Sequence, residues 1–115
     1  MLNRFMRIIL FFDLPVTTKA EVNIYRNFIK YLKSDGFIML QYSVYTKLCI
    51  NASSAKTVTK RIKKNTPANG DVRYLIITEK QFQSIVNVNR KYKLQEKVTT
   101  TDRTLQIGGL NDENK

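Results

Sequence analysis

Three apolar runs along the chain predict four β-strands. The first covers residues 7–12 and is followed by Asp13 and, two residues later, by a proline. Because proline has no amide proton, pairing of this strand should stop just past the acid. Residues 37–50 are too many for one ordinary strand, so they predict two strands with a tight reversal or bulge near residues 40–42, although no glycine marks the turn. Residues 71–78 predict the fourth strand.

A helix is predicted between the first two strands. Thr18 and Glu21 have the spacing of a capping box, which satisfies free amides at a helix start. Apolar residues then recur at helical spacing over residues 22–32. The helix should end at Asp35 and Gly36, because glycine suits the left-handed conformation of a helix cap.

A second helix is predicted after the third strand. Asn51 can cap its start, and residues 55–62 contain a narrow apolar stripe. Residues 65–70 have the composition of a loop. Residues 81–88 are ambiguous, because their apolar positions fit either a short helix or a strand.

The order strand, helix, strand, strand, helix, strand predicts an α+β fold, a ferredoxin-like βαββαβ sandwich with both helices on one face of an antiparallel sheet. Residues 1–88 should form this domain, residues 89–103 a connector, residues 104–110 an extra C-terminal strand and residues 111–115 a disordered tail. The sheet face without helices should bury against a second copy, which predicts a homodimer.

The chain is strongly basic, and its charge is unevenly distributed. Its 115 residues carry a net charge of +11, and no acidic residue lies between Asp35 and Asp71. A field of one sign over such a stretch favours nucleic acid as the partner, although a lysine-rich face that only confers solubility is the alternative. For Arg7, packing within the dimer is a further alternative. The candidate phosphate contacts are Arg4, Arg7, Lys47, Lys56, Lys60, Arg61 and Lys64.

The composition indicates a cytoplasmic protein. Cys49 is the only cysteine, cannot pair within the chain and is best explained as a small buried hydrophobe. The N-terminal residues lack an apolar stretch of signal-peptide length, and no segment is apolar enough for a membrane span, so no membrane partner is expected.

The aromatic residues are interpreted as core, because the exposed aromatic signature of ribonucleoprotein strands is missing. They are Phe5, Phe11, Phe12, Tyr25, Phe28, Phe37, Tyr42, Tyr45 and Tyr74.

Asp13 is the strongest candidate for chemistry. A carboxylate at the end of a buried strand can be held rigidly and still meet a metal ion, and Mg²⁺ prefers oxygen ligands. One aspartate makes a poor site, so two Asp13 side chains related by a two-fold axis are expected to share the ion with substrate phosphate. The sequence has no histidine, so hydrolysis would depend on metal-bound water. Tyr42, Ser43 and Tyr45 are weaker candidates for positioning phosphate, and the alternative for Asp13 is an acid that caps the turn before proline.

Four segments carry a resemblance to a known family. They are residues 6–15 (Met-Arg-Ile-Ile-Leu-Phe-Phe-Asp-Leu-Pro), 25–28 (Tyr-Arg-Asn-Phe), 36–45 (Gly-Phe-Ile-Met-Leu-Gln-Tyr-Ser-Val-Tyr) and 78–82 (Thr-Glu-Lys-Gln-Phe). In this combination they resemble the small CRISPR-associated protein of the spacer-adaptation complex, in the version found in type II systems. The resemblance runs from about residue 6 to residue 82 and again over residues 105–109.

The resemblance implies a ferredoxin-like dimer that sits between two dimers of the CRISPR integrase and holds double-stranded prespacer DNA. It also implies metal-dependent endonuclease cleavage, usually of single-stranded RNA and sometimes of DNA. Asp13 matches the family's magnesium-binding aspartate, so it is the expected catalytic and metal-binding residue. The segment at residues 105–109 matches the strand that ties the subunit to its neighbours.

Two interpretations from other functional classes remain open at this point. A basic structural protein of the ribosome can share this fold and charge, but it gives Asp13 and the proline after it no evident use. A free-standing ribonuclease toxin of similar fold should cut RNA without any partner.

Overall fold

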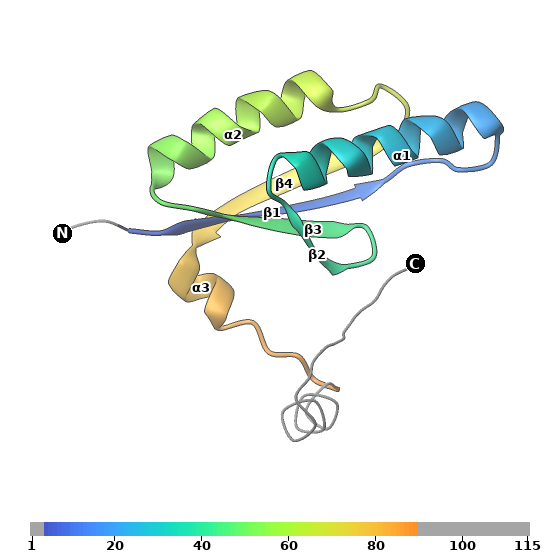
Figure 1. Ribbon diagram of the computed structural model, residues 1–115. Coiled ribbons are helices and arrows are strands. Elements are labelled where there is room, and N and C mark those ends of the chain that lie inside the picture. The colour runs from blue at the N-terminus through green and yellow to red at the C-terminus, as the bar shows by residue number, and fades with distance from the viewer. Residues whose placement is uncertain (1–3, 90–115) are drawn as a thin grey trace. The chain divides into compact units, whose positions relative to one another are not determined.

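The described part of the chain forms a four-stranded antiparallel sheet with two long helices on one face (Figure 1). The computed structural model describes residues 4–89. The strands are β1 (Met6–Asp13), β2 (Ile38–Gln41), β3 (Val44–Cys49) and β4 (Asp71–Thr78), and the helices are α1 (Lys19–Ser34), α2 (Ala52–Asn65) and α3 (Glu79–Gln83). The strand order β2-β3-β1-β4, with antiparallel neighbours throughout, is that of a ferredoxin-like sandwich. The predicted α+β fold is therefore confirmed.

All of these elements belong to one compact unit that ends at Ser84. Residues 85–89 form neither helix nor strand and are exposed, so the strand alternative for this segment is wrong. The connector beyond residue 89, the strand predicted at residues 104–110 and the tail at residues 111–115 lie outside the described residues.

Helix α1 begins and ends as its sequence predicts. The Thr18 hydroxyl accepts a hydrogen bond from the Glu21 amide at 3.1 Å, and the Glu21 carboxylate accepts one from the Thr18 amide at 3.0 Å. At the other end, Gly36 has φ +91°, and the amide of the following Phe37 donates to the Leu32 carbonyl at 2.9 Å. This is a Schellman motif, and Leu32 and Phe37 are both buried beside it.

The predicted break within residues 37–50 is a two-residue turn between β2 and β3. Ser43 adopts φ +64°, which supplies the left-handed geometry that glycine usually provides in a tight hairpin. The register also shifts between Met39 and Gln41, so a bulge precedes the turn. The prediction of an interruption is confirmed, and both of its predicted forms are present.

The ambiguity at residues 81–88 is resolved in favour of a helix that starts earlier, at Glu79. The Thr78 hydroxyl accepts a hydrogen bond from the Gln81 amide at 3.0 Å, and the Gln81 side chain accepts one from the Thr78 amide at 2.9 Å. The Thr78 and Gln81 pair is a second capping box, and its spacing is visible in the sequence. Strand β4 therefore leads directly into a helix of five residues.

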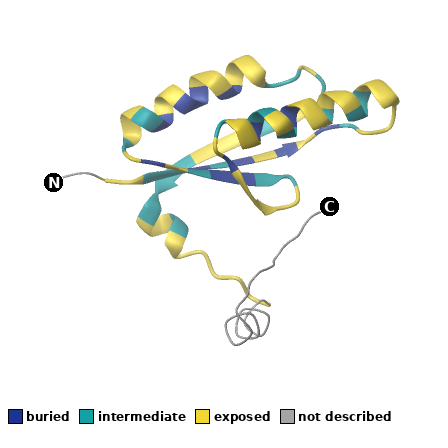
Figure 2. Cartoon of the chain, viewed as in Figure 1, coloured by how far each residue is buried: buried dark blue, intermediate teal, exposed yellow. Residues whose placement is uncertain are grey.

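The core lies between the sheet and helices α1 and α2 (Figure 2). Alternate residues of β1 point toward the helices, and each such apolar side chain contributes roughly 1.5–3 kcal/mol by burial. The Phe12 ring meets Phe28 edge-on at 5.3 Å and stacks on Tyr45 at 6.0 Å between ring centroids. The buried apolar residues are Ile8, Leu10, Phe12, Leu14, Phe28, Leu32, Phe37, Tyr45, Cys49, Ala55, Val58 and Ile62, so Cys49 is a buried hydrophobe as predicted.

The opposite face of the sheet exposes large apolar side chains, and within residues 4–89 no long helix covers it. Of the described helices, α3 alone lies on this side, at the end of the sheet near the start of β1 (Figure 1). Large apolar side chains are exposed there or at the sheet edges, and they include Phe11, Ile38, Leu48 and Leu75. The assignment of every aromatic residue to the core is thus wrong for Phe5, Phe11, Tyr42 and Tyr74, which are exposed in this chain.

Candidate functional site

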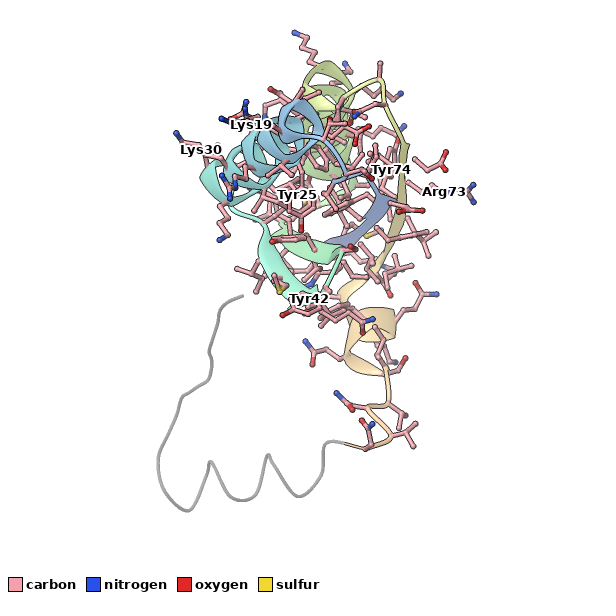
Figure 3. All side chains as sticks on the ribbon, turned by 90° about the vertical axis from the view of Figure 1, so that its right-hand side faces the viewer. Lys19, Tyr25, Lys30, Tyr42, Arg73 and Tyr74 are labelled. Atoms are coloured by element: carbon pink, nitrogen blue, oxygen red, sulfur yellow. The ribbon has the colours of Figure 1, made fainter. Side chains whose placement is uncertain are left out.

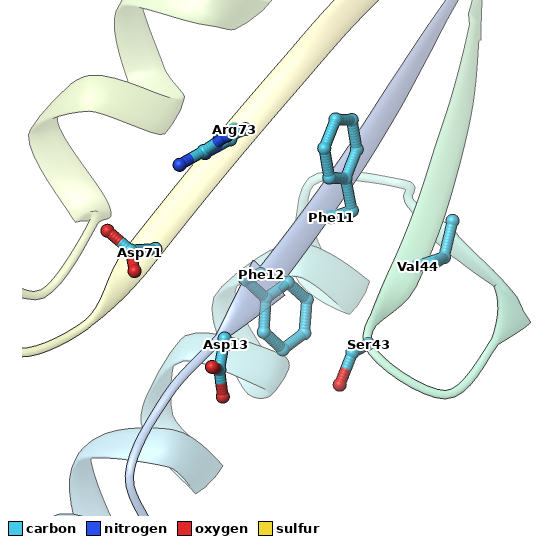
Figure 4. Close-up of a pocket in the computed structure, with 7 residues that line it drawn as sticks. All are labelled: Phe11, Phe12, Asp13, Ser43, Val44, Asp71 and Arg73. Atoms are coloured by element: carbon cyan, nitrogen blue, oxygen red, sulfur yellow. The ribbon is translucent and has the colours of Figure 1, made fainter.

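Two aspartates lie opposite each other where β1 ends and β4 begins. In the antiparallel register Asp13 is opposite Asp71, and Phe11 is opposite Arg73. Because side chains alternate along a strand and Phe12 points toward α1 and α2, these four side chains belong to the face opposite those two helices. They border a cavity of about 310 Å³ (Figure 4), lined by Phe11, Phe12, Asp13, Ser43, Val44, Asp71 and Arg73.

Asp13 is held by the loop that leads into β4. Gly70 has φ +127°, and a Cβ on it would lie 2.6 Å from the Asp13 carbonyl oxygen and 2.8 Å from the Leu14 Cδ2 atom. Only glycine permits this approach, so the loop can pack directly on the backbone that carries the carboxylate. On the other side, the Phe12 amide donates to the Ser43 carbonyl at 3.1 Å. The backbone around Asp13 is therefore fixed from both neighbouring elements, while its side chain is exposed.

The donors around the cavity suit a hard cation. Two carboxylates and the Ser43 hydroxyl offer only oxygen atoms, which Mg²⁺ prefers over nitrogen or sulfur. Within residues 4–89, no three His, Cys, Asp or Glu side chains gather in a way that could hold a metal. One chain thus supplies a carboxylate pair, and water, substrate phosphate or a second copy would have to complete the coordination.

Asp13 and Ser43 are among the residues predicted from the sequence, whereas Asp71 and Arg73 are not. The signal was available in principle, because Asp13 is the last residue of one strand and Asp71 the first of a strand antiparallel to it. Of the other phosphate candidates, Tyr45 points into the core with 1% of its surface exposed, so it cannot contact a phosphate in the cavity. Tyr42 lies in the β2–β3 turn and is exposed, but it is not among the cavity residues.

Five of the seven predicted phosphate-binding residues are exposed on the surface, and of these Arg61 also pairs with Asp35. Lys56, Lys60 and Lys64 follow one another at helical spacing on the solvent side of α2, whose first turn contains no acidic residue. Arg4 is exposed just before β1. Their contact with nucleic acid stays a prediction.

Lys47, which is partly buried, and the exposed Arg61 are both engaged by Asp35 at the end of α1. The Arg61 guanidinium donates to both Asp35 carboxylate oxygens, at 3.0 and 2.8 Å, and the Lys47 ammonium lies 3.6 Å from one of them. The Tyr31 hydroxyl donates to the same carboxylate at 3.0 Å. The hydrogen bond from Arg61 is the main cause that lowers the pKa of Asp35, and burial, helped by Asp35, raises the pKa of Tyr31. These cations join α1, α2 and β3.

The seventh candidate, Arg7, is tied to α3. Its guanidinium donates to the two Glu79 carboxylate oxygens at 2.7 and 2.6 Å, and its central carbon lies 4.1 Å from the centre of the Phe82 ring. The hydrogen bond from Arg7 lowers the pKa of the Glu79 carboxyl. The Arg7 side chain is only 12% exposed. Its contact with nucleic acid also stays a prediction, but the structure gives it an internal function.

Comparison with known proteins identifies the family. The family model described as CRISPR associated protein Cas2 matches residues 6–85, which include every helix and strand of the compact unit. The chain belongs to the Cas2 family. The resemblance inferred from its sequence motifs is thereby confirmed, in place of the ribosomal and toxin alternatives.

Several relatives carry the name CRISPR-associated endoribonuclease Cas2. The one from Ligilactobacillus salivarius is 44% identical over 100 residues, which cover 87% of this chain and 98% of the relative. The one from Streptococcus mutans serotype c is 46% identical over 84 residues, covering 73% and 77% respectively. The one from Treponema denticola is 49% identical over 77 residues, covering 67% and 76%. Among residues 4–89, no helix is long and apolar enough to cross a membrane.

Proposed function

We propose that two copies of this Cas2 chain form a subunit of the CRISPR adaptation complex, which bridges integrase dimers and binds double-stranded prespacer DNA. We also propose that the subunit has Mg²⁺-dependent endoribonuclease activity centred on Asp13. The observation that carries the nuclease proposal is the pairing of Asp13 with Asp71 at the rim of one cavity. The names of the relatives point to the same activity.

The chain's own residues account for binding and orientation at this site. Asp13, on its fixed backbone, and Asp71 would hold a magnesium ion, and the Ser43 hydroxyl can donate a hydrogen bond to a phosphate oxygen. When bound, the ion would polarise the phosphate and supply an activated water. Phe11 and Val44 form an apolar wall that limits water around the phosphate.

The nuclease proposal is tested with Asp13→Asn, which keeps the size of the side chain and removes its charge. Wild-type protein should cleave single-stranded RNA with Mg²⁺ and not with EDTA, while the variant should be inactive in both. Duplex DNA binding by the variant should be unchanged, since Asp13 makes no contribution to the basic surface. Metal-independent cleavage, or full activity of Asp13→Asn, would refute the assignment.

The dimer proposal is supported by the exposed apolar side chains on the sheet face that carries Asp13, opposite α1 and α2. Burying Phe11 and Leu75 against a second copy would remove apolar surface from water and bring two carboxylate pairs near a two-fold axis. Leu75→Glu should therefore shift the protein to a monomer in sedimentation equilibrium. The matched control is Val86→Glu, an exposed apolar residue outside the compact unit. Dimers that persist in Leu75→Glu would count against this interface.

A mixing experiment tests whether both copies of Asp13 are needed. Wild-type chains are unfolded, mixed with Asp13→Asn chains and refolded, so that subunits pair at random. If one site needs both carboxylates, activity should follow the square of the wild-type fraction. If each chain works alone, activity should follow that fraction linearly, and the shared two-fold site would be wrong.

The DNA-binding proposal is supported by the lysine row on α2. Replacing Lys56, Lys60 and Lys64 by Gln should weaken duplex DNA binding and reduce the slope of log K against log salt by about 0.9 for each DNA phosphate that these lysines neutralise. A control of equal charge replaces Lys19, Lys30 and Lys33 of α1, of which Lys19 and Lys30 are visible on the outside of that helix in Figure 3. Equal slopes for the two variants would mean that duplex DNA binding depends on the net charge of the protein and not on the position of the α2 lysines.

The bridging proposal is tested by assembly. Wild-type protein mixed with the integrase of its own CRISPR system should form one complex that contains both proteins and a duplex prespacer in size-exclusion chromatography. Asp13→Asn should form the same complex. Separate elution of the two proteins would contradict the bridging function.

A further inference from the structure

Arg73 lies at the same cavity as Asp13, on the edge strand β4. It is two residues from Asp71 and directly opposite Phe11 in the register with β1, so it is diagonal to Asp13 on the same face. Diagonal neighbours in a sheet are roughly 7–8 Å apart, a distance that an arginine side chain can span. Figure 3 shows Arg73 projecting from β4 into solvent, where a polyanion can reach it.

Arg73 differs from the two arginines that have internal functions. Arg7 donates two hydrogen bonds to Glu79, and Arg61 donates two to Asp35. Among the described residues, Arg73 has no ion pair or hydrogen bond of its side chain, although Asp71 is close in the sequence. Its guanidinium is therefore available for a ligand.

The charges around the cavity explain why a cation is needed beside the two acids. Asp13 and Asp71 together with Arg73 leave a formal charge of −1, which would repel a phosphodiester. A divalent cation would change this to +1, which matches the single negative charge of a phosphodiester. Without Arg73, the charges of the two carboxylates and the divalent cation would sum to zero, and nothing would attract the phosphate.

We propose that Arg73 binds the non-bridging oxygens of the nucleic-acid phosphate that lies at Asp13 and so positions it for cleavage. The inference rests on the proposed nuclease function of this site. The planar guanidinium can donate two parallel hydrogen bonds to phosphate, which fixes its orientation as well as its charge. The same interaction stabilises the negative charge that grows on these oxygens as the diester is cleaved.

The kinetic test compares Arg73→Gln, Arg73→Lys and the control Arg26→Gln, which removes an exposed arginine of α1. Cleavage of single-stranded RNA by Arg73→Gln should have kcat/KM lowered by about 10²-fold, the effect expected for loss of a donor to transition-state charge. Arg73→Lys should recover part of kcat/KM through charge alone, and Arg26→Gln should match wild type. Equal kcat/KM in Arg73→Gln and Arg26→Gln would overturn the proposal.

A binding test separates failure of this proposal from failure of the nuclease. Binding of single-stranded RNA is measured for Asp13→Asn with and without Arg73→Gln, so that cleavage plays no part. Removal of one phosphate-binding cation should reduce the slope of log K against log salt by about 0.7. If wild type does not cleave but the slope falls, only the nuclease is wrong. An unchanged slope, or a monomer in sedimentation of Arg73→Gln, would overturn the assignment of Arg73 to phosphate.

Discussion

Gly70 offers the sharpest test of how the Asp13 backbone is held. The change is Gly70→Ala, which adds one methyl group at φ +127°. Strain of this kind in a residue other than glycine is about 1–3 kcal/mol. The new Cβ would also lie 2.6 Å from the Asp13 carbonyl oxygen, a backbone atom that cannot rotate away, and overpacking of this kind adds about 1–3 kcal/mol. We therefore expect the free energy of unfolding to fall by about 2–6 kcal/mol, the sum of the strain and the overpacking.

Gly36→Ala is the matched control, because it places the same methyl group at φ +91°. Its Cβ would meet only the tip of the Lys47 side chain, at 2.8 Å from Nζ, and a flexible lysine can move. The remaining loss of stability comes from the strain of the left-handed backbone and is about 1–2 kcal/mol. The two variants thus have similar backbone strain and differ in what the methyl group strikes.

The assay is urea denaturation followed by circular dichroism, at one protein concentration because a dimer's stability depends on it. Gly70→Ala should have the lower midpoint at an unchanged m-value, and thermal unfolding should show the same order, at roughly 4–8 °C per kcal/mol. Gly70→Ala should also lose Mg²⁺-dependent RNA cleavage under conditions where it is folded, since misplacement by about 1 Å can reduce rates about 10²-fold. Equal midpoints for the two variants would refute the argument that Gly70 supports Asp13 by close approach.

Two further predictions concern the internal ion pairs. Glu79→Gln should lower the free energy of unfolding by about 1.5–3 kcal/mol, because it leaves the nearly buried Arg7 guanidinium without its charged partner. The control Lys80→Gln, on the same helix, should have little effect in the same urea assay. The pKa of Asp35 is lowered by folding, so its contribution to stability should be complete above its unfolded value of about 3.9 and be lost as the pH falls through the folded pKa. Unfolding midpoints measured between about pH 6 and about pH 2.5 should therefore drop less in Asp35→Asn than in wild type, and parallel curves would contradict this.

The sequence predicted most of the fold because its local signals agree with one another. The capping box at Thr18, the glycine after α1 and the apolar alternation of β1 all act within a few residues, so a linear pattern contains them. The β2–β3 turn was harder to place, because Ser43 adopts a left-handed conformation that residue type does not signal. The capping box of Thr78 and Gln81 is also visible in the sequence, but the strand-like residues 85–88 made a strand an equally good prediction for this segment.

The carboxylate site was only half predictable, because it depends on register. Asp13 stands out in the sequence by its position between an apolar strand and a proline. Asp71 and Arg73 become part of the site only when β4 pairs antiparallel with β1 in the observed alignment. A shift of one residue would turn both side chains to the other face, so residue type alone could not assign them.

The basic residues show why a count of charges is a poor guide to a nucleic-acid surface. The stretch between Asp35 and Asp71 lacks acids, yet Lys47 and Arg61 from that stretch both return to Asp35 itself. The acid at the edge of the basic segment neutralises part of it once the chain folds, because α2 packs beside the end of α1. Within this stretch, the positive field that remains comes from lysines for which residues 4–89 supply no such ion pair, and Lys56, Lys60 and Lys64 among them lie on the solvent side of α2. Affinity for duplex DNA should therefore follow the exposed lysines, while Arg61 and Lys47 should affect it mainly through the stability of the fold.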